Sequence, residues 1–332
     1  MRKSRPTAGC AKHAKRARRR FRSAYGGLVL ALVALTCVAE PPDELTVTGR
    51  YPGPPLWKVT SGTHELWIFG TLGLIPKDIT WGSVIVERVI GRANEVLRPP
   101  GVDAWARNPF RYPTLFFRAR KLTRNEGGAA LVTVLPPEIY ARYATIRDRY
   151  DAPRNLEQQR PAIVAGRLYA RAIDAAGLTS GRKLQTSVER LAHDARVKTT
   201  DTEVRADPGD LLDAAANLST DAEVECFSTV LASIENDLPG IADRARAWAL
   251  GDIAALRRFD YPDIEGECLT FAGTSAGLRE TMQKAGDAWL AAAEHALATN
   301  QTTFATLGVG DLLRSDGLLA RLRERGYDVR EP

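Results

Sequence analysis

The chain has 332 residues, of which 44% are apolar, enough to bury a sizeable core without a structural metal. Its formal net charge of +6 would suit a nucleic-acid-binding protein. However, residues 1–39 hold 10 of the 46 Lys and Arg residues and no Asp or Glu, so the rest of the chain carries 36 basic and 40 acidic residues, a formal charge of −4. The charge therefore belongs to the N-terminal segment, and we expect no nucleic-acid partner.

Residues 1–39 have the parts of an export signal. A basic region covers residues 2–22, an apolar run covers residues 28–38, and small residues follow. The apolar run is shorter than the roughly 20 residues that a membrane-spanning helix needs. We therefore predict a Sec-type signal peptide, a periplasmic or secreted protein, and no stable transmembrane anchor after cleavage. A twin-arginine signal, to which residues 18–21 bear a weak likeness, is an alternative.

The four cysteines divide between this signal and the remainder of the chain. Cys10 and Cys37 lie in the signal, and Cys37 also stands where a lipoprotein cysteine would, although Thr36 before it is a poor match. Cys226 and Cys268 remain after cleavage, and an even pair in an oxidising compartment predicts one disulfide. Two buried free thiols are the alternative.

The first strands follow a proline-rich tether over residues 40–55. Residues 56–60 and 64–70 are rich in Trp, Val, Ile and Phe, and Ser61-Gly62 between them predicts a hairpin. A helix is expected over residues 81–93 from its apolar spacing, and residues 95–97 predict a second core strand.

A long, mostly helical middle covers approximately residues 110–300, interrupted by a short strand at 197–200. The C-terminus returns to strand at 303–307 and 327–330. We therefore expect a single α/β (α+β) domain over residues 56–332, whose central mixed sheet is built from N- and C-terminal segments. Local signals mark several helix starts, at Pro137, Pro161 and Asp252.

Two segments far apart in the sequence resemble the TraB/GumN family. The first is Leu66-Trp67-Ile68-Phe69-Gly70-Thr71-Leu72-Gly73, and the second is Leu307-Gly308-Val309-Gly310-Asp311-Leu312 with Gly317-Leu318-Leu319 after it. The family opens with a strand ending in Gly-Thr-x-His and closes with Gly-x-x-His-Leu before a helix. Its relatives include the Tiki metalloproteases, and its fold is related to that of erythromycin-esterase-like proteins. The spacing of the two segments agrees with the family over essentially all of residues 56–332.

The resemblance implies a metal site that this sequence has lost. Active family members bind a divalent metal through two histidines and a glutamate, and the corresponding positions here are Gly73, Asp311 and Arg98 or the adjacent Pro99. Glycine has no lone pair to offer, and arginine is a permanent cation. We therefore predict no metal, no other cofactor and no family-type hydrolysis. The degenerate motif positions are Gly70, Gly73, Arg98, Gly308 and Asp311.

Two arrangements could still make a site at these positions. Asp311 with Asp316, joined by Glu87, would offer carboxylates for a cation or a general base, unless the two aspartates only cap turns and the final helix. Arg98 with Arg279 would instead bind an anion, unless these arginines form solvated or structural ion pairs.

The remaining conspicuous residues are better explained by the fold. His64 falls in the hairpin, away from the expected site, and His193 and His295 lie among polar residues of helices. The glycines at 70, 308 and 310 lack the lysine and hydroxyl of a phosphate loop and are interpreted as turn glycines. Five tryptophans lie in apolar segments and are expected in the core rather than on a carbohydrate platform: Trp57, Trp67, Trp81, Trp248 and Trp289.

The sequence therefore favours an exported, catalytically inactive pseudo-enzyme or binding protein. A metal-dependent hydrolase or peptidase with a rearranged carboxylate site around Asp311 is one alternative, and a partner in an envelope assembly is another. The ligand, the partners and the oligomeric state are not determined by the sequence.

Overall fold

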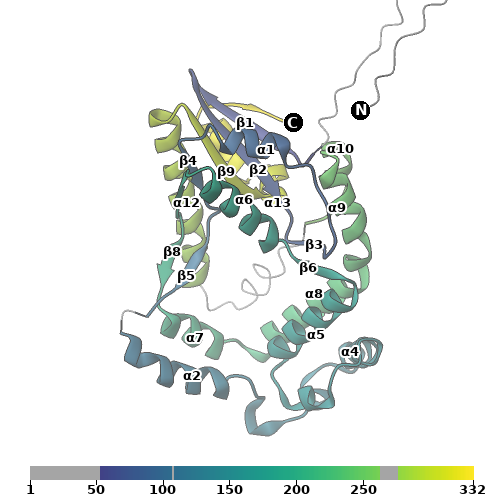
Figure 1. Ribbon diagram of the computed structural model, residues 1–332. Coiled ribbons are helices and arrows are strands. Elements are labelled where there is room, and N and C mark those ends of the chain that lie inside the picture. The colour runs from purple at the N-terminus through teal and green to yellow at the C-terminus, as the bar shows by residue number, and fades with distance from the viewer. Residues whose placement is uncertain (1–52, 107, 262–275) are drawn as a thin grey trace, which may run out of the picture. The chain divides into compact units, whose positions relative to one another are not determined.

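A computed structural model describes residues 53–106, 108–261 and 276–332, except the side chains of residues 276–279 (Figure 1). Its centre is a six-stranded sheet in the order β10-β1-β2-β9-β4-β7. β1 is antiparallel to its neighbours β2 and β10, whereas β2, β9, β4 and β7 are parallel. The strands are β1 (Leu56–Ser61), β2 (His64–Thr71), β4 (Glu95–Leu97), β7 (Lys198–Thr200), β9 (Thr302–Gly308) and β10 (Asp328–Arg330).

This sheet confirms the predicted fold class. Its strands come from both ends of the described chain, and only β7 comes from the helical middle. The predicted hairpin is β1–β2, in which Ser61 pairs with His64 and Gly62 takes φ +58°, a conformation that glycine adopts readily. β2 then pairs along its whole length with β9, a strand that lies more than 200 residues later.

Helices cover both faces of the sheet. On one face, Leu66 and Ile68 of β2 pack with α12 (Ala276–Thr299) and α14 (Leu318–Glu324). On the other face, Phe69 of β2 and Phe304 of β9 pack against a second layer of helices. Successive strand residues point to opposite faces, so a single apolar strand serves both layers. The second layer consists of α1 (Val84–Ile90), α6 (Arg182–Asp194), α9 (Ile241–Ala249) and α10 (Ile253–Leu256).

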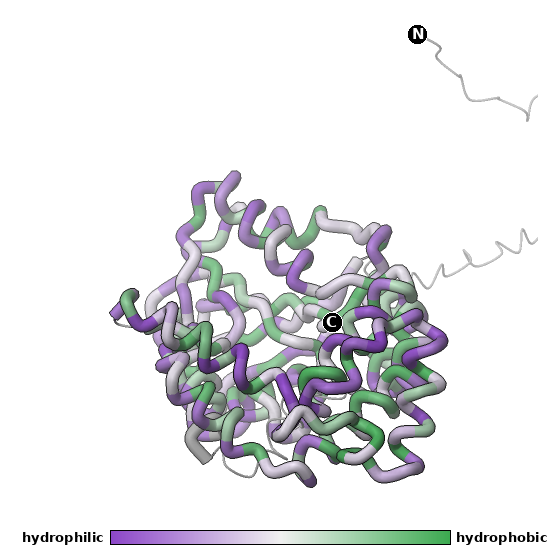
Figure 2. Tube along the Cα trace, turned by 90° about the horizontal axis from the view of Figure 1, so that it is seen from below, coloured by the Kyte–Doolittle hydropathy of each residue, from purple (hydrophilic) through white to green (hydrophobic). Residues whose placement is uncertain are grey.

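The helical middle has a separate apolar core, which we call the helical lobe. Tyr143 and Phe227 are fully buried there, with ring centroids 5.6 Å apart. Arg160 and Glu223 form an ion pair beside this core. Figure 2 shows hydrophobic and hydrophilic residues alternating in short stretches along the described chain. The lobe contains α3 (Leu131–Val134), α4 (Pro137–Arg149), α5 (Pro161–Ala175) and α8 (Thr220–Asn236).

Two further helices, α2 (Tyr112–Lys121) and α7 (Pro208–Ala216), lie side by side beyond the sheet (Figure 1). They are joined to it through β5 (Val102–Ala104) and β8 (Val204–Ala206), which form a small parallel ladder. A second small ladder joins β3 (Leu74–Pro76) to β6 (Leu178–Ser180). None of these four short strands is predicted from the sequence.

The predicted helix starts are confirmed, whereas the prediction of one turn is wrong. α4 and α5 begin at Pro137 and Pro161, and the Asp252 carboxylate accepts a hydrogen bond from the Ala255 amide at 3.0 Å as the cap of α10. The predicted turn at Gly308–Gly310 is instead the start of a short helix, α13 (Val309–Leu313). No described helix is long and apolar enough to cross a membrane.

Candidate functional site

The degenerate motif positions gather at one edge of the sheet. Because β2, β9, β4 and β7 are parallel, their carboxyl ends share this edge, where Thr71 pairs with Gly308 and Leu97 with Thr200. Gly73, Arg98 and Asp311 follow the ends of β2, β4 and β9. The carboxyl edge of a parallel sheet is the usual place for a ligand site in α/β proteins. We therefore take this edge as the candidate site.

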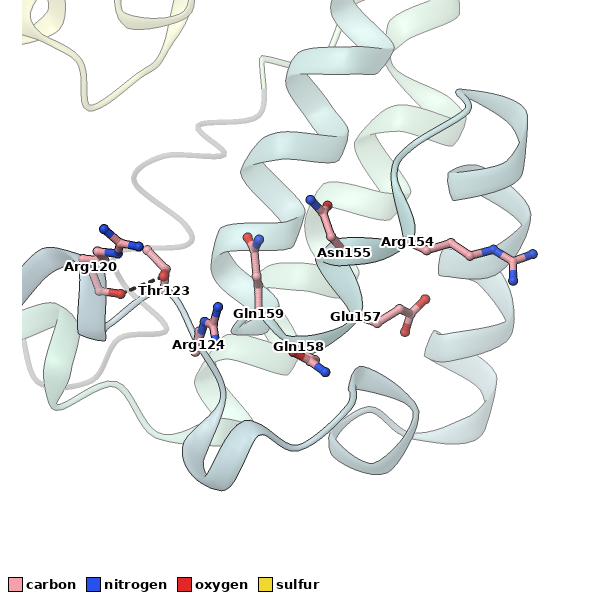
Figure 3. Close-up of a pocket in the computed structure, with 8 residues that line it drawn as sticks. All are labelled: Arg120, Thr123, Arg124, Arg154, Asn155, Glu157, Gln158 and Gln159. Atoms are coloured by element: carbon pink, nitrogen blue, oxygen red, sulfur yellow. Dashed lines mark hydrogen bonds between the residues drawn. The ribbon is translucent and has the colours of Figure 1, made fainter.

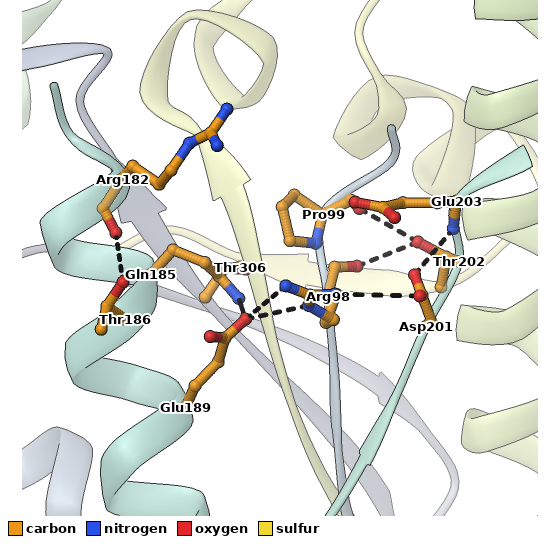
Figure 4. Close-up of polar contacts among 10 residues, drawn as sticks. All are labelled: Arg98, Pro99, Arg182, Gln185, Thr186, Glu189, Asp201, Thr202, Glu203 and Thr306. Carbon is orange, nitrogen blue, oxygen red and sulfur yellow. Dashed lines mark hydrogen bonds and ion pairs between the residues drawn. The ribbon is translucent and has the colours of Figure 1, made fainter. Parts of the chain in front are cut away.

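Arg98 is the central polar residue of this edge (Figure 4). Its Nε and one terminal nitrogen lie 2.9 and 2.8 Å from the same oxygen of Glu189, and another terminal nitrogen lies 3.8 Å from Asp201. Partial burial disfavours the charge, but the hydrogen bond and charge of Glu189, with the charges of Glu203 and Asp201, raise the pKa of Arg98 above its ordinary value. Arg98 is therefore a fixed cation surrounded by three carboxylates.

The contacts of Glu189 continue into the core through α6. Gln185, one helical turn before Glu189, donates from Nε2 to the Glu189 carboxylate at 3.2 Å. The fully buried Thr306 hydroxyl of β9 donates to Gln185 Oε1 at 2.8 Å. A continuous hydrogen-bonded chain therefore joins β9, α6 and β4, and this chain holds the Arg98 side chain in place (Figure 4). None of Glu189, Gln185 and Thr306 is predicted from the sequence as a site residue.

The residues that follow β7 also hold the backbone at this edge of the sheet. The buried Thr202 hydroxyl lies 3.1 Å from the carbonyl oxygens of both Arg98 and Pro99. The Asp201 carboxylate accepts a hydrogen bond from the Glu203 amide at 3.1 Å. The backbone of residues 98–99 and the acids beside Arg98 are thus fixed to one another.

The loop after β2 has room at the position where the resemblance places a histidine. Gly73 is exposed, and a Cβ atom built on it would meet nothing within 4 Å. Its carbonyl oxygen accepts a hydrogen bond from the Gly181 amide at 2.7 Å. The backbone of this loop is therefore held, while the space in front of Gly73 is open.

Gly70 is not a turn residue, contrary to the sequence interpretation. It lies inside β2, where a Cβ atom would come within 2.7 Å of the Trp57 ring. Its carbonyl oxygen accepts a hydrogen bond from the indole nitrogen of Trp248 at 2.6 Å. Close packing against two tryptophans therefore explains why this position has no side chain.

Asp311 faces an arginine in the structure. It lies in the first turn of α13 with 41% of its side chain exposed, 3.9 Å from an Arg314 terminal nitrogen. Arg314 also binds Asp316 at 3.0 Å and lowers the pKa of that carboxyl. Glu87 lies on α1 and accepts a hydrogen bond from Ser83. Within the described part of the chain, no group of three His, Cys, Asp or Glu side chains is placed to hold a metal ion.

Other predicted residues lie away from the site or outside the described residues. His64 is at the far end of β2, 2.7 Å from the Asn300 carbonyl oxygen, and His193 and His295 are exposed. The Arg279 side chain and Cys268 lie outside the described residues, while Cys226 is buried in α8. Three tryptophans are confirmed in the core with no exposed surface: Trp57, Trp248 and Trp289.

A signal for the missed residues exists in the sequence. Gln185 and Glu189 stand four residues apart on one flank of an amphipathic helix, a spacing at which side chains meet. Thr306 is one of three threonines in the buried strand β9, and a buried hydroxyl needs a hydrogen-bond partner. Only the contact between α6 and β9, in which Thr306 donates to Gln185 across 121 residues of sequence, brings these two signals together.

Comparison with known proteins gives the family of the chain. The sequence profile of the TraB/PrgY/gumN family matches residues 55–331, which includes every strand of the central sheet and the whole candidate site. No curated protein and no solved structure matches the chain. The matched residues therefore include β2, which precedes Gly73, and α14, which follows Asp311. The chain therefore belongs to the TraB/PrgY/gumN family.

Proposed function

We propose that this chain is an exported, metal-free and non-hydrolytic member of its family, a pseudo-enzyme whose site binds a ligand without metal chemistry. The observation that carries the proposal is the ion pair of Arg98 with Glu189 at the end of β4, where the resemblance expects a metal-ligating acid. A permanent guanidinium stands at that position, held by a hydrogen-bonded chain from Thr306.

The charges at this edge do not suit a divalent metal. A carboxylate cluster attracts a cation, but here Glu189 binds Arg98 directly and Asp201 lies 3.8 Å from it, so the arginine offsets part of their charge. A metal ion beside Arg98 would be repelled by it, and Gly73 supplies no donor atom. Asp311 faces Arg314. The same contacts favour a structural ion pair at Arg98 over an open anion site.

Metal analysis and thermal unfolding of the purified protein test this proposal. We expect no stoichiometric manganese, cobalt, zinc or iron, and no change in melting temperature when these ions are added. The triple variant Gly73→His, Arg98→Glu, Asp311→His should bind metal, and saturating metal at 100 times the Kd would stabilise it by about 2.7 kcal/mol. A wild-type protein that carries stoichiometric metal would contradict the proposal.

The alternative is a hydrolase with a carboxylate site around Asp311. It requires that wild-type protein show a metal-dependent rise in melting temperature that Asp311→Ala abolishes. Asp316→Ala is a matched control, because Asp316 binds the same arginine and is 78% exposed. If wild-type protein shows no metal-dependent rise, this alternative fails.

Export is the second part of the proposal. It can be tested by the mass of the protein, which reports both signal cleavage and the state of the two cysteines outside the signal. Cleavage after residue 39 gives an intact mass that begins at Glu40, and a Cys226–Cys268 disulfide lowers that mass by two hydrogens. We expect both in protein recovered from the periplasm of a Gram-negative host. Retention of the full-length chain in the cytoplasm would contradict export, and a mass unchanged by reductant would favour two free thiols.

A further inference from the structure

Helix α2 presents large aromatic side chains to solvent. Phe110, directly before the helix, is 88% exposed, and Phe116 and Phe117 are each 62% exposed. The rings of Phe116 and Phe117 lie 5.8 Å apart in an edge arrangement, and Tyr112 is 45% exposed. Single exposed apolar residues are ordinary, but a group of them on one short element marks an interaction surface.

The inner side of α2 is already occupied by α7. Leu115 is buried, and the Arg111 and Arg118 side chains form ion pairs with Asp207, the N-cap of α7, and with Asp213 within α7. Because neighbouring helical residues point in directions about 100° apart, Phe116 and Phe117 turn away from the face that Leu115 buries. The aromatic residues therefore form the outer face of this helix pair.

Cations follow the aromatic residues on the same helix. Arg120 and Lys121 stand one turn after Phe116 and Phe117, and Arg124 follows the helix; all three are exposed. Within the described residues, no acidic side chain pairs with any of them, and the segment 120–126 has a net charge of +2 with Glu126 counted. This charge is local, since the chain after residue 39 carries a net −4.

A polar hollow lies beside these cations (Figure 3). It has a volume of about 480 Å³, and Arg120, Thr123, Arg124 and Gln159 contribute to its wall. Its acid, Glu157, is 2.7 Å from Arg147 and is neutralised by it. Figure 3 shows Glu157 and Arg154 extending away from Arg120 and Arg124. The hollow thus offers positive charge and side-chain amides, which suit a phosphate group.

We infer that the outer face of α2 docks on the surface of an anionic phospholipid membrane. Phe110, Phe116 and Phe117 enter the boundary between headgroups and acyl chains, while Arg120, Lys121 and Arg124 contact lipid phosphates. Aromatic rings combined with unpaired Lys and Arg on one helical face are typical of helices that lie in the membrane interface. The charge complements an anionic surface. This surface is separate from the sheet edge, so the inference is independent of the proposed function.

Vesicle sedimentation of the purified protein tests the inference. We expect binding to vesicles of phosphatidylcholine mixed with phosphatidylglycerol, weakening as salt is raised, and little binding to phosphatidylcholine alone. Phe116→Ser/Phe117→Ser should abolish it. Arg120→Gln/Lys121→Gln should lower the partition coefficient about 30-fold, at roughly 1 kcal/mol per cation.

Two controls keep the test specific. Val84→Ser/Leu250→Ser removes apolar residues that are 65% and 54% exposed, one on α1 and one directly after α9, and should bind like the wild type. Melting temperatures should be unchanged in every variant, since the replaced side chains are exposed. Equal binding to both vesicle types, or wild-type binding by the phenylalanine variant, would overturn the inference. So would a wild-type dimer that ignores vesicles and that the phenylalanine variant converts to a monomer.

Discussion

Arg160→Ala is expected to lower the free energy of unfolding by about 3 kcal/mol, at the low end for a broken buried ion pair. Arg160 Nε lies 2.6 Å from a Glu223 oxygen, and 16% of the Arg160 side chain and 4% of the Glu223 side chain are exposed. Removing the arginine leaves a carboxylate buried against the helical lobe, where the Ala162 amide lies 3.4 Å from it. Urea unfolding followed by circular dichroism measures the loss.

A surface pair provides the matched control. Arg246 binds Asp243 at 2.7 Å, but both side chains are more than half exposed. Arg246→Ala should therefore cost no more than about 1 kcal/mol. The double variant Arg160→Met/Glu223→Met removes both charges and should recover most of the stability lost in Arg160→Ala, because the main cost lies in the isolated carboxylate. Equal losses in Arg160→Ala and Arg246→Ala would contradict this explanation.

The long strands β1, β2 and β9 were predictable because each is rich in apolar, aromatic and β-branched residues. β4 matches its prediction to the residue, β2 extends one residue beyond its predicted C-terminal end, and β9 extends one residue beyond its prediction at each end. The four three-residue strands of the small ladders were missed, since such short segments show no alternation and their partners lie about 100 residues away. Local pattern therefore determines the sheet, and tertiary pairing determines the connections around it.

The candidate site was predictable in position but not in its contacts. Gly73, Arg98 and Asp311 reach one edge because the motif spacing and parallel pairing require it. Glu189 looks like a solvent-facing residue of α6, and only the packing of that helix over β9 and β4 turns it toward Arg98. Similarly, the sequence offers the carboxylates around Asp311 as a candidate cation site, but in the structure Arg314 lies between Asp311 and Asp316.

Gly181→Ala is expected to destabilise the protein by about 3 kcal/mol or more, the upper range for an overpacked site. A Cβ atom on Gly181 would lie 1.5 Å from the Leu72 carbonyl oxygen, so the backbone after β2 would have to move. That movement would break the 2.7 Å hydrogen bond from the Gly181 amide to the Gly73 carbonyl oxygen. Urea unfolding measures the loss, and Gly166→Ala, in open space on α5, should be neutral or slightly stabilising.

Gly73→Ala should behave in the opposite way from Gly181→Ala, although the two glycines are hydrogen-bonded to each other. Gly73 has open space for a side chain and does not have a positive φ, so alanine should change the free energy of unfolding by less than about 1 kcal/mol. If both alanine variants are equally unstable, the loop after β2 is too rigid to accept the histidine that the triple variant places at position 73. If only Gly181→Ala is unstable, the fold still has room for a side chain at the position where the family resemblance places a histidine.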